Sequence, residues 1–422
     1  MKSVVNQTQR QLLSVYLQRG VVRFSDVAEK RTNVTSQDLG NYQAVDPGDL
    51  VLNNQQAWRG SVGVSEYSGI VSPAYLVLSL SASLSSRYAN LLFRDHSMVS
   101  QYLVCSKGVG TIQRNLYWPH LKRVGVIIPP PDEQAAIVRF LDWADGRLER
   151  MIRARRKVIA LLNEQKQTII HRAVTRGLAP SVSLKTSGIP WLGDIPEHWK
   201  PTPNRAYLRI RKLLVGRRHS EYQLLSLTKR GVIVRDLSEN RGKFSTDMGT
   251  SQEVGVGDLV FCLFDVPETP RTVGRSRHAG MITGAYTVME CADQSVAQFL
   301  EAFYIAMDDR KLLSPLYSGL RNTIPKERFL GAKTPLPPPD ERDAILEYVK
   351  RETRGLDEAI DRKARQIALM QEYRTRLVGD VVTGKLDVRE AAARLPDEAL
   401  AAAADDNDAS DEIEADEEEA AA

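Results

Sequence analysis

The feature that most constrains this chain is an internal duplication. The segment PPPDEQAAIVRFL, at Pro129–Leu141, recurs as PPPDERDAILEYV at Pro337–Val349. The register then holds without a gap as far as Thr175 in the first copy and Thr383 in the second. Such self-similarity predicts two copies of one structural unit within a single chain.

The regions upstream of these segments also correspond, with offsets that drift as loop insertions require. The order of elements is therefore module, helix, module, helix, and 422 residues are enough for several domains. The matching elements are LLSVYLQRGVV at Leu12 with LLSLTKRGVIV at Leu224, GDLVLN at Gly48 with GDLVFC at Gly257, GIVSPAY at Gly69 with GMITGAY at Gly280, and Arg114-Asn115 with Arg321-Asn322.

Each triple proline opens a long stretch in which apolar residues recur in steps of three and four. This period predicts a helix with one apolar seam, and proline followed by acidic residues is a typical helix start. We expect spacer helices over 132–178 and 339–387 that pair antiparallel, which would relate the modules by a pseudo-twofold axis and set their spacing. The helix-pairing residues are Ile137, Leu141, Leu148, Ile152 and Leu162 in the first helix and Ile345, Val349, Leu356, Ile360 and Met370 in the second.

Basic residues interrupt both seams at equivalent positions: Arg155 and Lys363, then Lys166 and Arg374. Polar residues in a seam tend to fix the register and orientation of pairing. Long basic side chains can instead extend out of the seam into water. Both interpretations are open from the sequence.

The modules mix short strands with helical stretches, so the expected fold class is α+β, with two globular α/β modules separated by a coiled coil of two long helices. The apolar spacing predicts a helix over Val296–Asp308. The expected strands are Leu50–Asn53, Leu76–Leu80, Val124–Ile128, Leu259–Phe264 and Tyr286–Cys291.

The net charge of +4 hides a strong asymmetry along the chain. Asp405–Glu419 holds ten acidic residues and no basic one, so the rest of the chain is markedly basic. A basic body favours a polyanionic partner such as nucleic acid, although basic proteins of other kinds are common in the cytoplasm. The segment 388–422, rich in alanine and acidic residues, is expected to be a disordered tail.

Polar residues that can contact DNA gather in loops of both modules. Arginine and lysine pair with guanine, and asparagine and glutamine with adenine. The alternatives are a solvated hairpin loop for the base-reading candidates and capping of the helix junction for the phosphate candidates. The base-reading candidates are Asn53, Gln55, Gln56 and Arg59 in the first module and Arg271, Arg275 and Arg277 in the second, and the phosphate candidates are Lys107, Arg114, Arg321 and Lys326.

Sequence signals of catalysis and cofactor binding are missing. There is no GxxxxGK[ST] phosphate loop, no GxGxxG after a strand and no nucleophile elbow. The three cysteines, Cys105, Cys262 and Cys291, lack the spacing of a metal site. We expect a non-catalytic, cytoplasmic chain, because no signal peptide or membrane-spanning run is visible either.

Several motifs in the right order resemble the specificity subunit of type I restriction-modification systems. They are PPPDEQAAIVRFLD and PPPDERDAIL at the helix starts, LLNEQKQTIIHRAVTRGL at the first helix end, and SGIPWLGDIPEHW from Ser187. The resemblance covers nearly the whole chain up to about Ala391.

The resemblance implies a bipartite DNA site read by two target recognition domains, 1–131 and 201–338, with 179–200 as a linker and the start of the second repeat. It implies double-stranded DNA, two methyltransferase subunits and restriction subunits as partners. It also implies that S-adenosylmethionine, ATP and Mg²⁺ are bound by those partners, whereas this chain binds no cofactor or metal. A coiled-coil scaffold for other proteins, or an orphan specificity protein without a working nuclease, are the alternative functions.

The first copy departs from the second in one respect. The second copy carries Ser187–Gln223 ahead of its LLS segment, whereas only eleven residues precede Leu12 in the first. Either the start has been placed too far downstream or the first domain is truncated, and the expected first domain is short at its N-terminal side.

Overall fold

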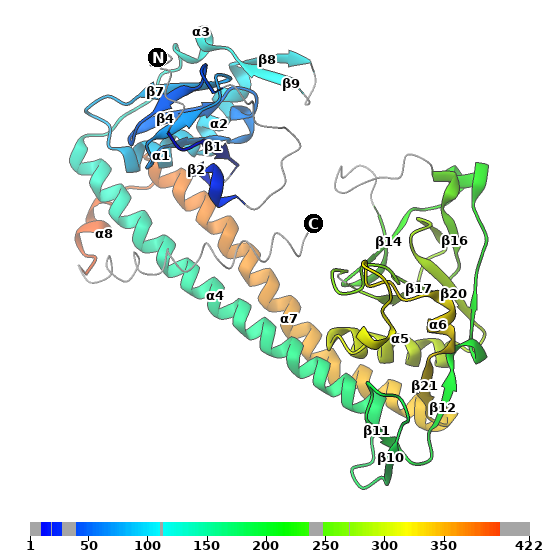
Figure 1. Ribbon diagram of the computed structural model, residues 1–422. Coiled ribbons are helices and arrows are strands. Elements are labelled where there is room, and N and C mark those ends of the chain that lie inside the picture. The colour runs from blue at the N-terminus through cyan, green and yellow to red at the C-terminus, as the bar shows by residue number, and fades with distance from the viewer. Residues whose placement is uncertain are drawn as a thin grey trace. The chain divides into compact units, whose positions relative to one another are not determined.

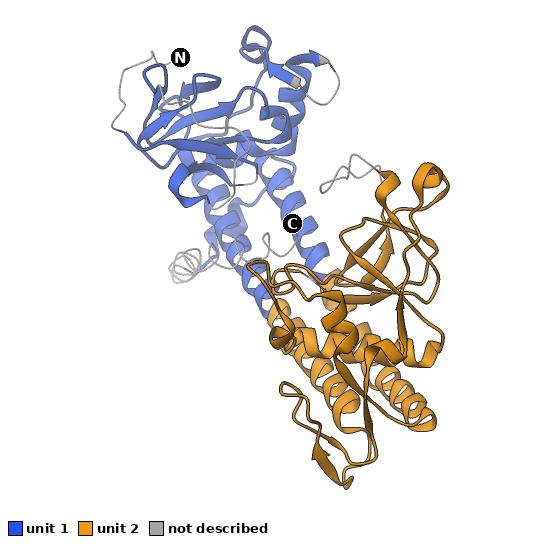
Figure 2. Cartoon of the chain, turned by 45° about the vertical axis from the view of Figure 1, so that its right-hand side comes forward, with its two compact units in different colours: residues 1–154, 366–413 blue, residues 155–365, 414–422 orange. Residues whose placement is uncertain are grey.

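The computed structural model describes residues 10–17, 19–27, 39–109, 113–235, 248–269 and 271–396. The chain divides into two compact units (Figure 2). Among the described residues, unit 1 lies within 10–154 and 366–396, and unit 2 within 155–365. Each unit therefore combines one globular module with one part of each long helix.

The module of unit 1 is built, in its described residues, from short antiparallel strands and three short helices. Its central sheet has the order β5-β4-β7, and three two-stranded sheets, β1-β2, β3-β6 and β8-β9, surround it. The elements are β1 (Leu13–Tyr16), β2 (Gly20–Arg23), β3 (Gln43–Val45), β4 (Asp49–Asn53), β5 (Val62–Val64), β6 (Gly69–Val71), β7 (Tyr75–Ser79), α1 (Ser86–Arg94), α2 (His96–Val104), β8 (Ser106–Val109), β9 (Gln113–Leu116) and α3 (Trp118–Leu121).

The module of unit 2 repeats this plan with additional strands. Its central sheet has the order β13-β20-β17-β18, and β14-β15 and β16-β19 repeat β1-β2 and β3-β6. The elements are β10 (Leu184–Thr186), β11 (Asp194–Pro196), β12 (Lys200–Pro203), β13 (Leu208–Ile210), β14 (Leu225–Thr228), β15 (Gly231–Val234), β16 (Gln252–Val254), β17 (Leu259–Phe261), β18 (Val273–Arg275), β19 (Gly280–Ile282), β20 (Thr287–Cys291), α5 (Gln294–Asp309), α6 (Lys326–Gly331) and β21 (Lys333–Leu336).

The expected strands at the centre of each module are confirmed. The continuous apolar runs of β4 and β17 are buried because both faces of each strand pack against a hydrophobic core: alternate side chains of β4 join two different core clusters, and those of β17 do the same. The helix expected over Val296–Asp308 is confirmed as α5, whose buried side includes Phe299 and Phe303. The positions of these central strands and of α5 thus follow from the pattern of apolar residues in the sequence.

Two equivalent glycines explain why GIV and GMI recur in the duplication. A Cβ atom on Gly69 would lie 2.5 Å from the carbonyl oxygen of Gln11, and one on Gly280 would lie 2.5 Å from that of Gln223. In both units the residues next to this close contact form an isolated parallel β-bridge, between Leu12 and Ile70 in unit 1 and between Leu224 and Met281 in unit 2. Only glycine lets the two backbones come this close.

We expect Gly280→Ala to lower the free energy of unfolding by about 2 kcal/mol, because the added methyl group must push the Gln223 segment away. Urea unfolding followed by circular dichroism measures the change. Gly355→Ala is the matched control, since Gly355 lies in the interior of a helix with no atom near its missing Cβ, and this variant should be slightly stabilised. Equal stability of the Gly280→Ala variant and the wild type would contradict the packing explanation.

The strand expected over Val124–Ile128 is wrong. This segment has no regular secondary structure, and Ile127 and Ile128 are 91% and 43% exposed. By the register of the repeat it corresponds to β21, which pairs antiparallel with β12. Among the described residues, no strand equivalent to β12 pairs with the backbone of Val124–Ile128.

The long helices are α4 (Pro131–Arg176) and α7 (Pro339–Val382), which both begin at the last proline of a triplet (Figure 1). In unit 1 the first part of α4 packs against the last part of α7. The apolar residues buried there are Ile137, Leu141, Leu148 and Ile152 of α4 and Leu377 and Val381 of α7.

In unit 2 the last part of α4 lies with the first part of α7, so the pairing is antiparallel in both units. Ile345 is fully buried in the core of this unit, together with Ala173 and Val174 of α4. The remaining expected pairing residues are half-buried: Leu162, Val349, Leu356, Ile360 and Met370.

Two of the four basic seam residues, Lys166 and Arg374, make ion pairs from one helix to the other. Arg374 donates to Asp145 at 2.8 Å in unit 1, and the ammonium group of Lys166 lies 2.5 Å from Asp357 in unit 2. Burial raises the pKa of Asp145, and the charge of Arg374 opposes that shift. These contacts favour the interpretation that the basic seam residues fix the register of the helix pair.

The acidic tail begins later than expected. Val388 and Ala392 are buried in the core of unit 1, and Arg389–Ala393 forms the short helix α8. Arg389 also reaches Glu133 at the start of α4, at 3.8 Å. Residues 388–396 are therefore part of unit 1, because they cover the end of its core, and the rest of the expected tail lies outside the described residues.

Candidate nucleic-acid interface

In unit 1 the loop after β4 presents polar side chains around the ring of Trp58. Asn53 accepts a hydrogen bond from the backbone of Gln55 at 3.1 Å, and the indole nitrogen of Trp58 donates to the carbonyl of Gln55 at 2.9 Å. The guanidinium carbon of Arg59 lies 4.7 Å from the centre of the Trp58 ring. The side chains of Gln55 and Gln56 are exposed. Four predicted base-reading residues are thus placed on one turn.

The β8-β9 hairpin brings one of the predicted phosphate residues, Arg114, to the same turn. The backbone of Leu116 donates to the carbonyl of Asn54 at 2.9 Å, which ties β9 to the loop. The guanidinium of Arg114 lies 5.9 Å from the Trp58 ring centre, on the same ring as Arg59. Lys107 lies 3.9 Å from the ring centre of Tyr117. We name Asn53–Arg59 with Lys107, Arg114 and Tyr117 the basic-aromatic surface.

The chemistry of the basic-aromatic surface suits a polyanion with readable edges. An arginine that rests against an aromatic ring keeps its planar set of donors oriented, and its charge remains available to a phosphate or a guanine. Tyr117 is 40% exposed and also contacts the ring of His120, 4.8 Å between centres. The sequence pattern did not single out Tyr117, although an aromatic residue next to the Arg114-Asn115 pair was a signal for it.

The predicted base-reading residues of unit 2 are placed differently. Arg271 donates to Asp309 at 2.8 Å, and Arg275 lies 3.6 Å from Glu301, so both guanidinium groups face acids of α5. Burial raises the pKa of Glu301 and of Asp309, and the neighbouring arginines oppose the shift. Such half-buried pairs are typical of structural residues. A base-reading role for these two arginines stays a prediction.

Other basic residues of unit 2 are exposed. Arg277 lies beyond the end of β18, and Lys326 begins α6. Arg321 is 81% exposed, although its guanidinium lies 3.7 Å from Asp265. Lys229, at the turn between β14 and β15, is an exposed basic residue that the sequence analysis did not name as a DNA-binding candidate. Its backbone carbonyl accepts a 3.5 Å hydrogen bond from Arg271. The structure therefore gathers fewer of the predicted residues in unit 2 than in unit 1.

The described residues hold neither a candidate metal site nor a candidate membrane-spanning helix. Across the described ranges, no group of three or more histidine, cysteine or acidic side chains is placed to hold a metal ion. Within the same ranges, no helix has the length and apolar character to cross a membrane. All three cysteines are buried and free.

Comparison with known proteins gives a likeness of fold. No family model matches the chain. A chain from a study described as "Structural basis underlying complex assembly and conformational transition of the type I R-M system" is 13% identical with a TM-score of 0.55, over 82% of this chain and 84% of that one. The HsdS subunit from Thermoanaerobacter tengcongensis is 13% identical with a TM-score of 0.38, over 81% and 82%.

The S subunit of a type I restriction-modification system from M. genitalium is 10% identical with a TM-score of 0.33, over 90% of each chain. The first of the three likenesses has the higher TM-score and spans both units of this chain. This chain therefore shares its fold with a chain from a study of a type I restriction-modification system, as the sequence resemblance implies.

Proposed function

We propose that this chain is the non-catalytic DNA-recognition subunit of a type I restriction-modification complex and acts in the cytoplasm. The observation that carries the proposal is the duplication itself, because two copies of one module suit a target in two parts. The basic-aromatic surface of unit 1 supplies charge, hydrogen-bond donors and aromatic rings in one place. Each module reads one half-site of double-stranded DNA.

The two modules differ where they would contact bases, which supports two different half-sites. Unit 1 offers an asparagine, two glutamines and arginines around Trp58. In unit 2, Asp265 and Glu268 lie in the loop after β17, and the exposed basic residues lie elsewhere. The two modules share their strand arrangement but differ in the residues of these loops, as expected if each module recognises a different base sequence.

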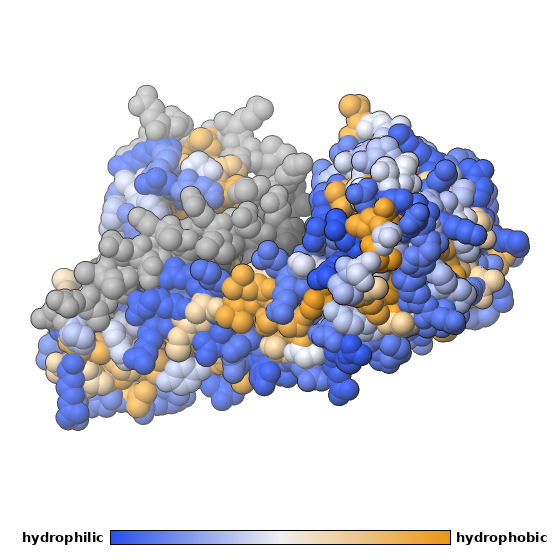
Figure 3. Space-filling model, turned by 90° about the horizontal axis from the view of Figure 1, so that it is seen from below, coloured by the Kyte–Doolittle hydropathy of each residue, from blue (hydrophilic) through white to orange (hydrophobic). Residues whose placement is uncertain are grey.

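The long helices are the proposed docking surface for two methyltransferase subunits. Val158 and Leu161 of α4, and Leu369 and Tyr373 of α7, are exposed although they are large and apolar. Figure 3 shows one face of the molecule, on which apolar side chains gather among a mainly hydrophilic surface. Exposed apolar side chains on a helix favour a protein partner. S-adenosylmethionine, ATP and Mg²⁺ belong to the methyltransferase and restriction subunits.

Methylome sequencing of cells with and without this gene tests the proposal. The expected result is a set of methylated sites of one bipartite sequence that disappears when the gene is deleted. In vitro, the complex with methyltransferase should bind that duplex with an affinity that falls steeply as salt rises, because phosphate contacts release counterions. An unchanged methylome, together with a complex that binds random duplexes equally well, would instead support the protein-interaction scaffold.

A further inference from the structure

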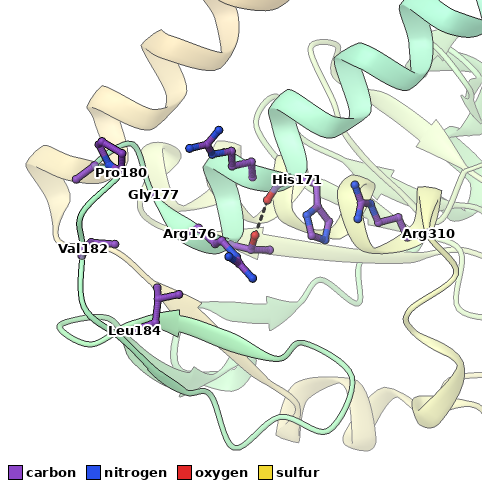
Figure 4. A pocket seen from close by; sticks show the side chains of 10 residues that line it. His171, Arg176, Gly177, Pro180, Val182, Leu184 and Arg310 are labelled. Carbon is purple, nitrogen blue, oxygen red and sulfur yellow. Dashed lines mark hydrogen bonds between the residues drawn. The ribbon is translucent and has the colours of Figure 1, made fainter.

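A pocket in unit 2 carries a concentration of positive charge that the DNA-reading role does not use. It has a volume of about 400 Å³ and lies where α4 ends. Arg172 and Arg176 come from the last turns of α4, and Arg310 follows the end of α5. Figure 4 shows His171, Arg176 and Arg310 together on one side, and the chain segment with Pro180 and Val182 on the other.

Positive charge dominates the lining of this pocket, although the Glu341 carboxylate lies close to it, with Oε1 2.9 Å from where a Cβ atom on Gly177 would stand. No aspartate or glutamate lines it. Within the part of the chain that the structure describes, Arg172, Arg176 and Arg310 have no ion pair. Burial, reinforced by the charges of Arg310 and Arg176, lowers the pKa of His171 to about 4. The imidazole is therefore neutral near pH 7, although the charges of Arg310 and Arg176 act on it.

The internal repeat shows whether the basic residues at the end of α4 are needed for the fold, because the equivalent positions at the end of α7 can be compared with them. In the gapless register of the two helices, His171 and Arg172 correspond to Gly379 and Asp380. Arg176 corresponds to Gly384. Unit 1 therefore ends its helix without any of these basic groups, and its Asp380 pairs with Lys385 at 3.6 Å. Unit 1 therefore folds without a cluster of this kind at the end of its helix.

We propose that the pocket formed by Arg172, Arg176, Arg310 and His171 binds a phosphate group. Guanidinium groups from two elements can donate to several oxygens of one phosphate, and the neutral imidazole can donate one further hydrogen bond. The volume is sufficient for a phosphate with part of a nucleotide attached. The phosphate comes either from a DNA backbone or from a free anion, and this binding does not depend on the DNA-reading role proposed above.

Calorimetric titration of the full chain with inorganic phosphate tests the proposal. Wild type should bind, and Arg172→Gln/Arg310→Gln should bind at least about tenfold more weakly, because each charge-assisted contact contributes roughly tenfold. Lys157→Gln is the matched control, since it removes one exposed positive charge of α4 outside the pocket. The side chains of Arg172, Arg310 and Lys157 are all exposed. Thermal unfolding shows whether each variant keeps its fold. If the double variant is unstable, the single variant Arg310→Gln takes its place in the titration. Equal binding by wild type and variant would overturn the proposal.

Ring NMR signals of the six histidines give a second readout. Sulfate, whose charge is constant over the titration, should raise the pKa of His171 from about 4 because it offsets the arginine charges. A random duplex that raises the same pKa and competes with phosphate identifies a DNA backbone as the source. A duplex that neither changes the pKa of His171 nor competes with phosphate identifies a free anion as the ligand. Failure of sulfate to move the His171 titration would contradict the site even if DNA recognition is proved.

Discussion

Replacing Trp199 by alanine is expected to lower the free energy of unfolding of unit 2 by about 3–5 kcal/mol. The side chain is fully buried and packs edge to face against Phe299, 6.0 Å between ring centres. Its indole nitrogen donates to Glu341 at 3.1 Å, and Glu341 also accepts from His198 at 2.6 Å. The truncation therefore leaves a cavity and removes one of two donors from a carboxylate of the first turn of α7.

Urea unfolding followed by circular dichroism measures this loss, with two variants that separate its causes. Trp199→Phe keeps most of the volume but loses the hydrogen bond, so it should cost about 1–2 kcal/mol. Trp191→Ala removes a half-buried ring that lies 6.3 Å from Phe303, and it should cost less than Trp199→Ala. A Trp199→Ala variant as stable as wild type would show that SGIPWLGDIPEHW does not anchor the core of unit 2.

The elements that the sequence predicted well are those whose signal is local. The starts of α4 and α7 follow from a proline, two acidic residues and an apolar stripe, all read along one segment, whereas α7 ends at Val382, before the expected residue 387. The buried strands β4 and β17 follow from short apolar runs next to glycine. Even the equivalence of the two modules was visible, because identical motifs recur in the same order.

The predictions that were wrong depended on partners distant in the chain. Val124–Ile128 has strand-like residues, but a strand forms only where another backbone pairs with it. Val388 looked like the start of a tail because nothing near it in the sequence reveals the core that it joins.

The candidate site shows the same division. The loop residues Asn53–Arg59 were recognisable by type, whereas the arrival of Arg114 at the ring of Trp58 depends on the tie between β9 and Asn54. Arg271 precedes β18 and Arg275 ends it, and each faces an acid of α5 that lies 38 or 26 residues further along the chain. Charge partners of this kind are not visible in a local pattern.

We expect Arg59→Gln/Arg114→Gln, tested in the complex with methyltransferase, to weaken binding of the cognate duplex by roughly 10–100-fold. Both guanidinium groups lie on the ring of Trp58, so the double change removes two charges from one place. The slope of affinity against salt should fall by about two for this reason. Competition binding at several salt concentrations measures both quantities, and thermal unfolding confirms that unit 1 is intact.

The control for this experiment is Arg147→Gln, which removes an arginine 5.5 Å from the ring centre of Trp143 on α4. Because α4 belongs to the proposed docking surface, gel filtration first checks that this variant still forms the complex with methyltransferase. The variant should leave affinity and salt slope as in wild type. Duplexes altered in one half-site then show what Arg59 and Arg114 do: base readers lose discrimination at that half-site alone, whereas phosphate anchors weaken every duplex equally. If the double variant binds like the Arg147→Gln control at every salt concentration, the basic-aromatic surface is not the DNA-binding face of unit 1.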